Sequence, residues 1–426
     1  MSAAADAPER ARSEGLIVLL VGAIQFINIL DFVIPLPMGP DLARGLGFGT
    51  NQIGLVGGAY TAAAAVSGLV GSFFLDRFDR RKVVAVAMTG LVMGTVAGGF
   101  ARGLASLMAA RILAGLFGGP ATSVSLSIVA DVVPVERRGA ALSKVTAAFS
   151  VAQILGVPIA LELGRRLGWR APFFFTAGAG VLVVGTAISW LPPMRAHLQR
   201  GGHVPFEQAV REVKEILVRP VVQLSYLTTA VVMAGGFILI PNISAYVQDN
   251  LGYPRAMLWS LYASGGVASL VSMQLVGRLV DRYGAFRVAL LGAGALSATV
   301  YVGFINYPAG FPIRAIYVAF MTSTAFRNVA YNTLVSRVPR PQWRARFMSL
   351  QSSVQHVSSA LGASASSWIL GATPPGQRLV HVDVVAEICV LLTLVLPLLM
   401  RAVENRVNAR DRAEKEASPR SALAPS

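Results

Sequence analysis

Long apolar segments recur along the chain and constrain its fold more than any other feature. Twelve runs of roughly 20 residues, separated by charged breaks, begin near Leu16, Gln52, Val83, Leu104, Ala140, Ala171, Val221, Met257, Phe286, Pro312, Phe347 and Val380. An α-helix needs ~20 apolar residues to cross ~30 Å of hydrocarbon, whereas a membrane β-strand needs about half as many and alternates apolar with polar side chains. These runs do not alternate. Because hydrophobic residues make up 54 % of the chain and charged residues only 14 %, we predict an all-α membrane protein with twelve transmembrane helices.

The placement of basic side chains along the chain indicates whether the positive charge suits nucleic acid or a membrane surface. The formal net charge is +16, which on its own would suit nucleic acid. With the N-terminus inside, the predicted cytoplasmic segments hold 27 Lys and Arg and the external segments hold 8, while Arg111 and Arg327 lie within helices. This asymmetry is typical of a protein of the cell membrane with both termini in the cytoplasm. We therefore expect a lipid bilayer, and no nucleic acid, around this chain.

Residues that carry enzyme chemistry are sparse. Cys389 is the only cysteine, and the four histidines are scattered. The sequence therefore offers no disulfide framework, no clustered metal ligands and no clustered nucleophile, and predicts neither an enzyme nor a bound cofactor. Arginine outnumbers lysine by 33 to 4, a bias that fits a bacterium with a GC-rich genome.

Landmarks of the first half recur 205 residues later in the second. Asp76-Arg77-Phe78 returns as Asp281-Arg282-Tyr283, Pro134 as Pro339, and Leu46-Gly47-Phe48 as Leu251-Gly252-Tyr253. Three landmarks in one register predict two pseudo-symmetric six-helix bundles. We expect a cytoplasmic N-terminal segment over residues 1–15, bundles over 16–193 and 221–403, a cytoplasmic linker over 194–220, and a tail over 404–426.

The linker and the tail differ in apolar pattern. In the linker, apolar residues at helical spacing alternate with charged ones, which predicts a short amphipathic helix on the inner membrane surface. These apolar residues are Phe206, Val210, Val213, Ile216 and Leu217. The tail shows no apolar periodicity, so we expect it to be disordered.

This organisation, with Asp-Arg loops after the second and eighth helices, resembles the major facilitator superfamily over nearly the whole chain. The family's loop signature is Gly-x-x-x-Asp-Arg-x-Gly-Arg-Arg/Lys. It corresponds to Gly71–Lys82, where Gly71 stands one residue early and Asp79 replaces the second glycine. In the second half it corresponds to Gly277–Gly284, which lacks the Arg that should follow.

Further motifs narrow the resemblance to proton-driven bacterial drug and sugar-efflux permeases. Arg111–Gly115 resembles the fourth-helix motif, Asp131–Gly139 the acidic-proline-basic exit from that helix, and Gly168–Arg170 a feature of bacterial efflux members. Gly156 and Pro158 resemble a shortened fifth-helix antiporter motif, in which they would act as a hinge. The resemblance implies a monomeric secondary transporter that exports a small amphipathic or cationic molecule in exchange for protons.

Asp31 is the most informative single residue. A carboxylate this deep in an apolar helix costs roughly 2.5–3.5 kcal/mol on insertion scales. Gln25, Asn28 and Asp31 are spaced by three and share one helical face, which predicts a wall along a polar cavity. Arg111 lies at equal depth in the fourth helix and could pair with Asp31. The alternatives are that Asp31 reaches to the outer interface and that Arg111 only braces the first half.

The second half lacks this charge pair, because the register carries Asp31 onto Gly236 and Arg111 onto Ile316. In its place we predict a second wall made by Arg327, Gln351, Gln355 and His356. Arg327 would bind an anionic group, neutralise a carboxylate across the cleft, or bond to backbone carbonyls. His356 would titrate near neutral pH or serve as a hydrogen-bonded core residue. This asymmetry places proton coupling in the first half, at Asp31.

The loop motifs are expected to form a cytoplasmic gate, as the resemblance implies. A carboxylate at a helix end can accept bonds from the free amides of a neighbouring helix start. The gate residues are Asp76, Arg77, Arg80, Arg81, Asp131, Glu136 and Arg138 in the first half, and Gly277, Asp281, Arg282 and Gly284 in the second. The alternative is that the basic cluster only sets topology.

Two other functions remain open at this stage. The polar side chains Gln25, Asn28, Gln351 and Gln355 could instead bind a neutral solute such as a sugar, in an importer or uniporter. A membrane receptor without transport activity, or a lipid scramblase, is the remote alternative. The expected partners of a transporter are a small-molecule substrate, protons and lipid.

Overall fold

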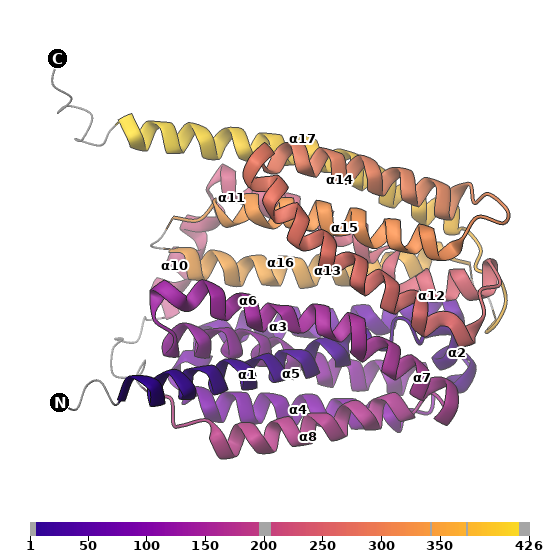
Figure 1. Ribbon diagram of the computed structural model, residues 1–426, viewed down its shortest axis with the longest axis horizontal. Helices are drawn as coiled ribbons and strands as arrows, with labels where there is room; N and C mark the ends of the chain where they lie inside the picture. Colours follow the sequence, from indigo (N-terminus) through magenta and orange to yellow (C-terminus); the bar gives the residue numbers. More distant parts are fainter. Residues whose placement is uncertain (1–5, 196–205, 341–342, 372–373, 417–426) are drawn as a thin grey trace.

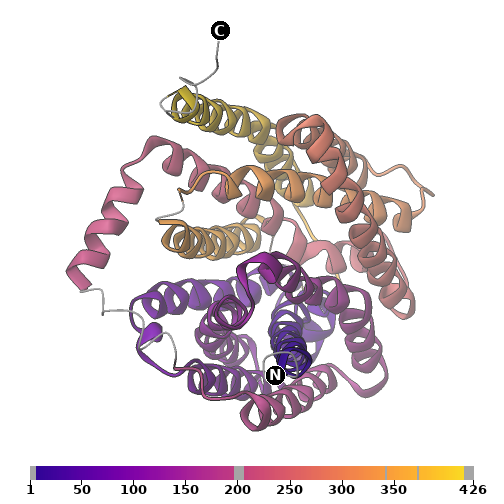
Figure 2. The same cartoon turned by 60° about the vertical axis from the view of Figure 1, so that its left-hand side comes forward.

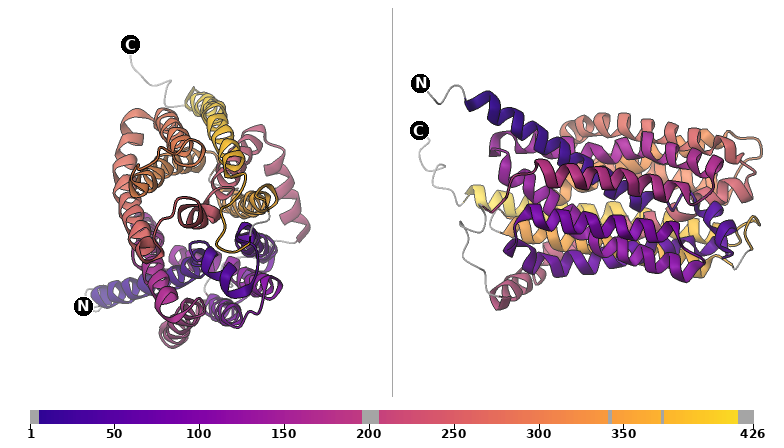
Figure 3. Two further views of the ribbon diagram at one scale, coloured as in Figure 1. Left: turned by 90° about the vertical axis from the view of Figure 1, so that its right-hand side faces the viewer. Right: turned by 90° about the horizontal axis from the view of Figure 1, so that it is seen from below.

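The computed structural model describes residues 6–195, 206–340, 343–371 and 374–416. Within this part of the chain every regular element is helical. Its long helices run roughly parallel to one another (Figure 1, and Figure 3 from below). Ten of the helices are long and apolar enough to cross a membrane. The start of α1 (Asp6–Val33) and the end of α17 (Val382–Glu416) lie at the same end of the bundle, which we call the terminal end; α2 (Gly39–Leu46), α7 (Val157–Leu167) and α12 (Ile243–Ala245) mark the opposite, distal end (Figure 1).

The first half contains six long helical segments. They are α1 (Asp6–Val33), α3 (Ile53–Phe74), α4 (Arg80–Gly99), α5 (Leu104–Val132), the continuous segment α6 (Val135–Val151), η3 (Ala152–Gly156) and α7 (Val157–Leu167), and α8 (Ala171–Trp190). The short helix α2 (Gly39–Leu46) follows α1 at the distal end.

The second half repeats this arrangement. Its segments are α11 (Pro220–Phe237), α13 (Leu258–Tyr283), α14 (Ala285–Val300), α15 (Ile313–Ser336), α16 (Arg344–Ile369) and α17 (Val382–Glu416), with α12 (Ile243–Ala245) after α11. Helices α15 and α16 are 24 and 26 residues long and are not among those ten. The twelve predicted helices, six in each half, are thus all present.

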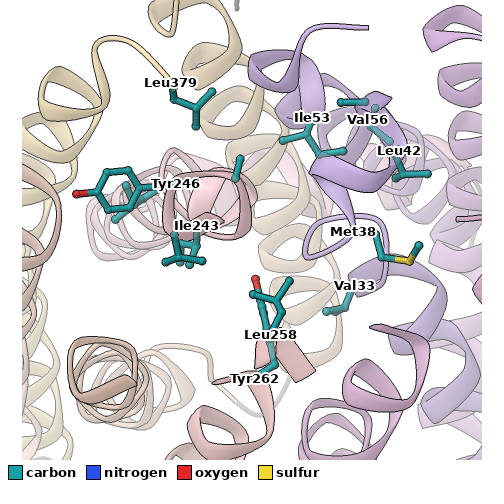
Figure 4. Packing of buried hydrophobic residues seen from close by; sticks show 14 of the residues in the cluster. Val33, Met38, Leu42, Ile53, Val56, Ile243, Tyr246, Leu258, Tyr262 and Leu379 are labelled. Atoms are coloured by element: carbon teal, nitrogen blue, oxygen red, sulfur yellow. The ribbon is translucent and has the colours of Figure 1, made fainter. Parts of the chain in front are cut away.

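Three apolar clusters show how the halves meet. One cluster is shared: Val33, Met38 and Ile53 of the first half lie near Ile243 and Leu258 of the second (Figure 4). The other two are each confined to one half. Apolar burial therefore joins the halves at the distal end, while toward the terminal end each half has its own core. Figure 2 turns the terminal end forward, with the first half below the second.

The predicted hinge lies at a defined irregularity. Between α6 and α7 the backbone makes a π-turn over Ala152–Gly156, which ends two residues before Pro158. A proline has no N–H to donate, and single π-turns are common at functional points in helices. A Cβ on Gly156 would stand 2.4 Å from Leu30, so its glycine permits close packing of this segment on α1. Hinge motion at this point remains a prediction.

The linker contains the expected helix, and the tail does not match its prediction. Helix α10 (Phe206–Leu217) is present, and Ile216 is buried in the second-half cluster. Disorder from residue 404 was wrong as far as Glu416, because α17 continues to that residue. Val403 and Val407, one turn apart, are buried in the same cluster, and this spacing supplies the apolar face that composition concealed. Residues 417–426 lie outside the described part.

Candidate functional site

The carboxylate of Asp31 and the guanidinium of Arg111 form a buried pair between α1 and α5. Nη1 of Arg111 lies 3.0 Å from each carboxylate oxygen, and Nη2 donates to the main-chain oxygen of Asp31 at 3.0 Å. The hydroxyl of Thr95 in α4 donates to the carboxylate at 2.7 Å. Both charged side chains are 1 % exposed. The pairing suggested by equal depth is therefore present, and Asp31 does not reach to an interface.

A chain of polar contacts, beginning with a cation–π contact, continues from this pair toward the terminal end. The guanidinium of Arg111 lies 4.7 Å from the ring centroid of Tyr60, and the Tyr60 hydroxyl donates to Oδ1 of Asn28 at 2.7 Å. Nδ2 of Asn28 donates to the Thr122 hydroxyl at 2.6 Å, and Nε2 of Gln25 to the Thr122 carbonyl at 3.3 Å. These contacts link α1, α3 and α5 through polar groups inside the first half.

This geometry corrects one expectation about α1. Gln25, Asn28 and Asp31 do share a face, but that face packs on α5 and is 6 %, 4 % and 2 % exposed, respectively. It is not an open cavity wall, because each polar group finds its partner on a neighbouring helix. Tyr60 and Thr122 were not singled out from sequence, since a single Tyr or Thr in an apolar run carries no signal of its neighbour.

The second half has a polar cluster without a charge pair. The Tyr331 hydroxyl of α15 donates to Thr229 of α11 at 2.8 Å, and Nε2 of Gln351 in α16 donates to Tyr331 at 3.1 Å. Oε1 of Gln351 is buried with no partner in the described part of the chain. Gln355 is half-buried one turn further. His356 Nδ1 lies 2.8 Å from the Ser352 carbonyl, so it acts as the donor there.

Arg327 is buried differently from Arg111. It is 3 % exposed, and its side-chain bond among described residues runs from Nε to Oδ1 of Asn328 at 3.3 Å. No described carboxylate lies within 4.0 Å of it. Nη2 stands 3.4 Å from where a Cβ on Gly236 would be. Of the roles left open, bonds to backbone carbonyls and neutralisation of a described carboxylate are not observed.

The first loop motif makes contacts within the first half. Arg80 pairs with Asp131, and Arg81 donates to the Ile188 carbonyl. Asp79 caps α4 by accepting from the Arg81 amide at 3.0 Å, and also from the Met194 amide at 3.1 Å. Burial alone would raise the pKa of Asp79, but its bonds to Met194, Arg195 and Arg81 lower it below its ordinary value. The departure from the family glycine thus supplies an N-cap.

The rest of the predicted gate is only partly described. The side chains of Asp76 and Glu136 lie outside the described part. Nε of Arg138 is buried and has no hydrogen-bond partner among the described residues. In the second half Arg282 lies over the ring of Tyr283, and Gly284 joins α13 to α14 at φ 85°, a conformation that favours glycine. Gly277, Asp281 and Arg77 make no hydrogen bond or ion pair with a described residue of the opposite half, so gating by this loop remains a prediction.

The hydrogen bonds found between described residues of the two halves lie at the distal end. Arg255 of the second half donates to Asp41 at 2.8 Å and to the Leu161 carbonyl at 2.9 Å. The Ser244 hydroxyl donates to the Pro37 carbonyl at 2.5 Å. These contacts join α2 and α7 of the first half to residues that follow α11. No local sequence pattern indicates these contacts, because the partners are more than ninety residues apart.

Helices α3 and α16 also meet across the halves. Their contact is close because α3 has glycine at 54 and 58: a Cβ on Gly54 would stand 2.1 Å from the Ala363 carbonyl oxygen, and one on Gly58 would stand 3.2 Å from that of Ala360. Asn51 donates to the Ser367 carbonyl at 3.4 Å. Glycines four residues apart on one face were the available sequence signal. The distal end is thus closed.

A pocket of about 880 Å³ opens between α1 and α6, toward the terminal end. Its lining is mostly apolar and includes Val18, Leu19, Phe26 and Val151. The charged residues in its lining are Glu14, Arg137 and Lys144. A volume of this size can enclose a drug-sized molecule.

A comparison of the sequence with models of known families shows which family the chain belongs to. The sequence model of the Major Facilitator Superfamily matches residues 21–363. The chain belongs to the Major Facilitator Superfamily. It is therefore a multi-pass membrane protein of a transporter family, as the motifs indicated. The chain is also 28 % identical over 267 residues to the inner membrane transport protein YdhP of Escherichia coli (strain K12); the match covers 63 % of this chain and 66 % of YdhP, just under two thirds of that relative.

Solved structures of this superfamily share the fold. A D-xylose-proton symporter superposes with a TM-score of 0.70 and 17 % identity, covering 89 % of this chain and 96 % of that one. The nucleoside transporter NupG gives 0.72 and 14 %, covering 91 % and 99 %. A bacterial homologue of the human lysosomal transporter Spinster, in an inward-facing and occupied conformation, gives 0.71 and 16 %, covering 92 % and 97 %. At these identities the likeness establishes the architecture alone.

Proposed function

We propose that this superfamily member exports a small amphipathic molecule in exchange for protons, by alternating access. The observation that carries the proposal is the buried pair of Asp31 and Arg111, which the second half does not repeat. A carboxylate inside a membrane bundle is costly, and such residues commonly mark proton pathways. The protein needs no cofactor in this scheme, because the proton gradient supplies the energy.

Protonation of Asp31 would weaken the contact between α1 and α5. The charged carboxylate accepts both Arg111 bonds and the Thr95 bond. Once neutral, it no longer balances the guanidinium, which then stays buried against the Tyr60 ring and one carbonyl. Removing one partner of a buried pair costs about 3–5 kcal/mol. An energy of that size is enough to shift a two-state equilibrium between conformations.

The arrangement of the two halves supports alternating access, because one end of the bundle is closed and a pocket opens toward the other. The distal end is closed by Arg255 and the glycines of α3, while the pocket between α1 and α6 opens toward the terminal end. The charge asymmetry of the loops assigns the terminal end to the cytoplasm. The described conformation would then accept substrate from the cytoplasm, and breaking the distal contacts would release it outside.

A proton fits the buried pair better than a cationic substrate does. Both side chains are 1 % exposed, so an organic cation would need space that the pair does not leave, whereas a proton needs none. The mostly apolar pocket provides the surface for an amphipathic substrate. By analogy with YdhP, we place the protein in the inner membrane. That it is a monomer is an expectation from the motif resemblance.

A second candidate is import or facilitated passage of a neutral solute such as a sugar. The unpartnered Oε1 of Gln351 beside Tyr331 favours it, because a solute hydroxyl could donate to that oxygen. The D-xylose-proton symporter and NupG, which share the fold, carry solutes of this kind by name. The direction of proton movement on adding substrate to sealed vesicles separates the candidates, because protons move against the substrate in an exchanger, with it in a symporter, and not at all in a uniporter.

The test uses the full chain in liposomes with an internal pH-sensitive dye. A substrate is first found by thermal-shift screening of the purified protein. We expect Asp31→Asn to abolish pH-driven substrate movement and substrate-driven proton flux while retaining substrate binding. Asp383→Asn, an exposed carboxylate on α17, is the matched control and should behave as wild type. Full pH-driven transport by Asp31→Asn would overturn the role of Asp31.

A further inference from the structure

The pocket between α1 and α6 carries an uncompensated positive charge. Two of its charged residues cancel, because Arg137 Nη2 lies 3.0 Å from Glu14 Oε2. Lys144, on α6, forms no hydrogen bond or ion pair with another described residue, and its side chain is exposed. The charge left over in the lining is therefore that of one ammonium group.

The buried interior of the two halves also holds a positive charge without a described counter-charge. Asp31 is neutralised by Arg111 within the first half. Arg327 is 3 % exposed in the second half and has no described carboxylate within 4.0 Å. A buried guanidinium without a counter-charge is unfavourable, and an approaching anion lowers that cost. Both unbalanced charges, one at the pocket and one inside the second half, would repel an organic cation and attract an anion.

The rest of the pocket wall is mostly apolar, in contrast to the ammonium group of Lys144. Val18, Leu19 and Phe26 of α1 and Val151 of α6 line it, and Leu19 is 69 % exposed. Leu19 and Lys144 belong to the two helices that form the pocket, so one molecule can cover the apolar wall with its hydrocarbon part and place a charged group near the ammonium. This combination matches a ligand with an apolar body and a negative group, such as a carboxylate.

We propose that the transported molecule is an amphipathic anion, held by the apolar wall of this pocket and by Lys144. The proposal rests on the proposed function, in that it takes the pocket as the entry site of the substrate. It replaces the amphipathic or cationic substrate of the sequence analysis with a molecule of defined charge. The cationic option was based on Asp31, and that carboxylate is already paired.

The experiment measures binding of three probes that share one apolar body. These are naphthoate, naphthylmethanol and naphthylmethylamine, which are anionic, neutral and cationic at neutral pH. The full chain is held in nanodiscs of neutral lipid, and naphthyl fluorescence reports binding. We expect wild type to bind naphthoate more tightly than the alcohol and the amine. Lys144→Glu should reverse this order, with a change of roughly tenfold for each charged probe.

The matched control is Ser143→Glu, which adds a carboxylate at the neighbouring exposed position of α6, outside the pocket lining. It should leave the order of the three probes unchanged. Equal effects of both variants would show a general surface field instead of a site, and preference of wild type for the amine would overturn the proposal. Thermal unfolding of each variant confirms that it is folded.

Failure of this proposal can be told apart from failure of the proposed function. Probe binding is measured at one pH and without a proton gradient, so it does not depend on coupling at Asp31. If naphthoate binding follows Lys144 but Asp31→Asn still transports, the coupling scheme is wrong and the anion site stands. If coupling depends on Asp31 but the probes ignore Lys144, the anion site is wrong and the transporter scheme stands.

Discussion

Replacing both members of the buried pair should cost much less stability than replacing either one. In Arg111→Gln, the Asp31 carboxylate stays buried and keeps only the Thr95 hydroxyl, 2.7 Å away, of the side-chain partners described above. In Asp31→Asn, the guanidinium stays 1 % exposed and loses its charge partner. Each single change should cost about 3–5 kcal/mol, because it leaves an uncompensated buried charge.

The double variant Asp31→Asn/Arg111→Gln leaves two neutral amides in the same space. Amides can bond to each other and to Thr95, and exchanging a buried pair for neutral groups is often close to neutral in stability. We therefore expect the double variant to recover at least half of the loss caused by either single change. With single losses of about 3 kcal/mol or more and a double loss of at most half of one of them, the coupling energy of the cycle would be about 4.5 kcal/mol or more, well above the few tenths expected for independent sites.

The protein contains its own reporter for this assay. Cys389 is the only cysteine, and it is 1 % exposed, so a thiol-reactive fluorophore labels it only after unfolding. Thermal midpoints of the four proteins in detergent give the cycle. At about 2 °C for each kcal/mol in a large chain, the single variants should unfold roughly 6–10 °C below wild type. Additive losses in the double variant would refute the argument that charge pairing links α1 to α5.

Three further perturbations test contacts at the two ends. Asp79→Ala removes an N-cap and should lower the free energy of unfolding by about 1–2 kcal/mol. Because the pKa of Asp79 is lowered in the folded state, this difference in stability between wild type and variant is complete above the ordinary pKa of the carboxyl, 3.8. The difference is lost as the pH falls through the folded pKa. Gly54→Ala should open the distal seam, because its Cβ would stand 2.1 Å from the Ala363 oxygen, at a cost of about 1–3 kcal/mol to the closed state. Arg255→Gln removes the ion pair to Asp41 and should shift the same equilibrium in the same direction.

The measurements follow from the expected changes. For Asp79→Ala, midpoints are compared from neutral pH downward, and a difference that grows on acidification contradicts the assignment. For the two seam variants, Ser367→Cys in a Cys389→Ser background reports opening, because Ser367 is 6 % exposed in the closed seam. A membrane-impermeant maleimide should label it several-fold faster. Gly178→Ala, whose Cβ meets no atom within 4 Å, should leave the rate unchanged; equal rates in all variants would contradict the seam.

The number and order of the helices could be predicted because each apolar run carries its own signal. Burial in lipid requires a run of ~20 apolar residues wherever a helix crosses, independent of its neighbours. The same reasoning found Asp31, since a carboxylate in such a run stands out locally. The same reasoning from apolar runs was less reliable where charged and apolar residues are mixed. The charged residues after residue 404 concealed the apolar spacing of Val403 and Val407, whose side chains pack in the second-half cluster and hold the end of α17.

Contacts between distant segments needed the tertiary structure. Depth along two helices suggested that Asp31 and Arg111 could meet, but only the fold shows that Gln25, Asn28 and Asp31 face α5 instead of a cavity. The distal contacts of Arg255 with Asp41 and Leu161 join residues 214 and 94 positions apart. No local pattern reports which side chain will lie opposite another after such a separation.

By itself, the sequence determined a duplicated, twelve-helix membrane protein with an acid, Asp31, inside an apolar run of its first half, because hydrophobic length, charge placement and repeat register are properties of the chain itself. Only the tertiary structure decided which end is closed, which charges cancel and where a pocket remains. Those depend on how helices from two halves pack, and therefore on pairs of residues that the sequence holds far apart.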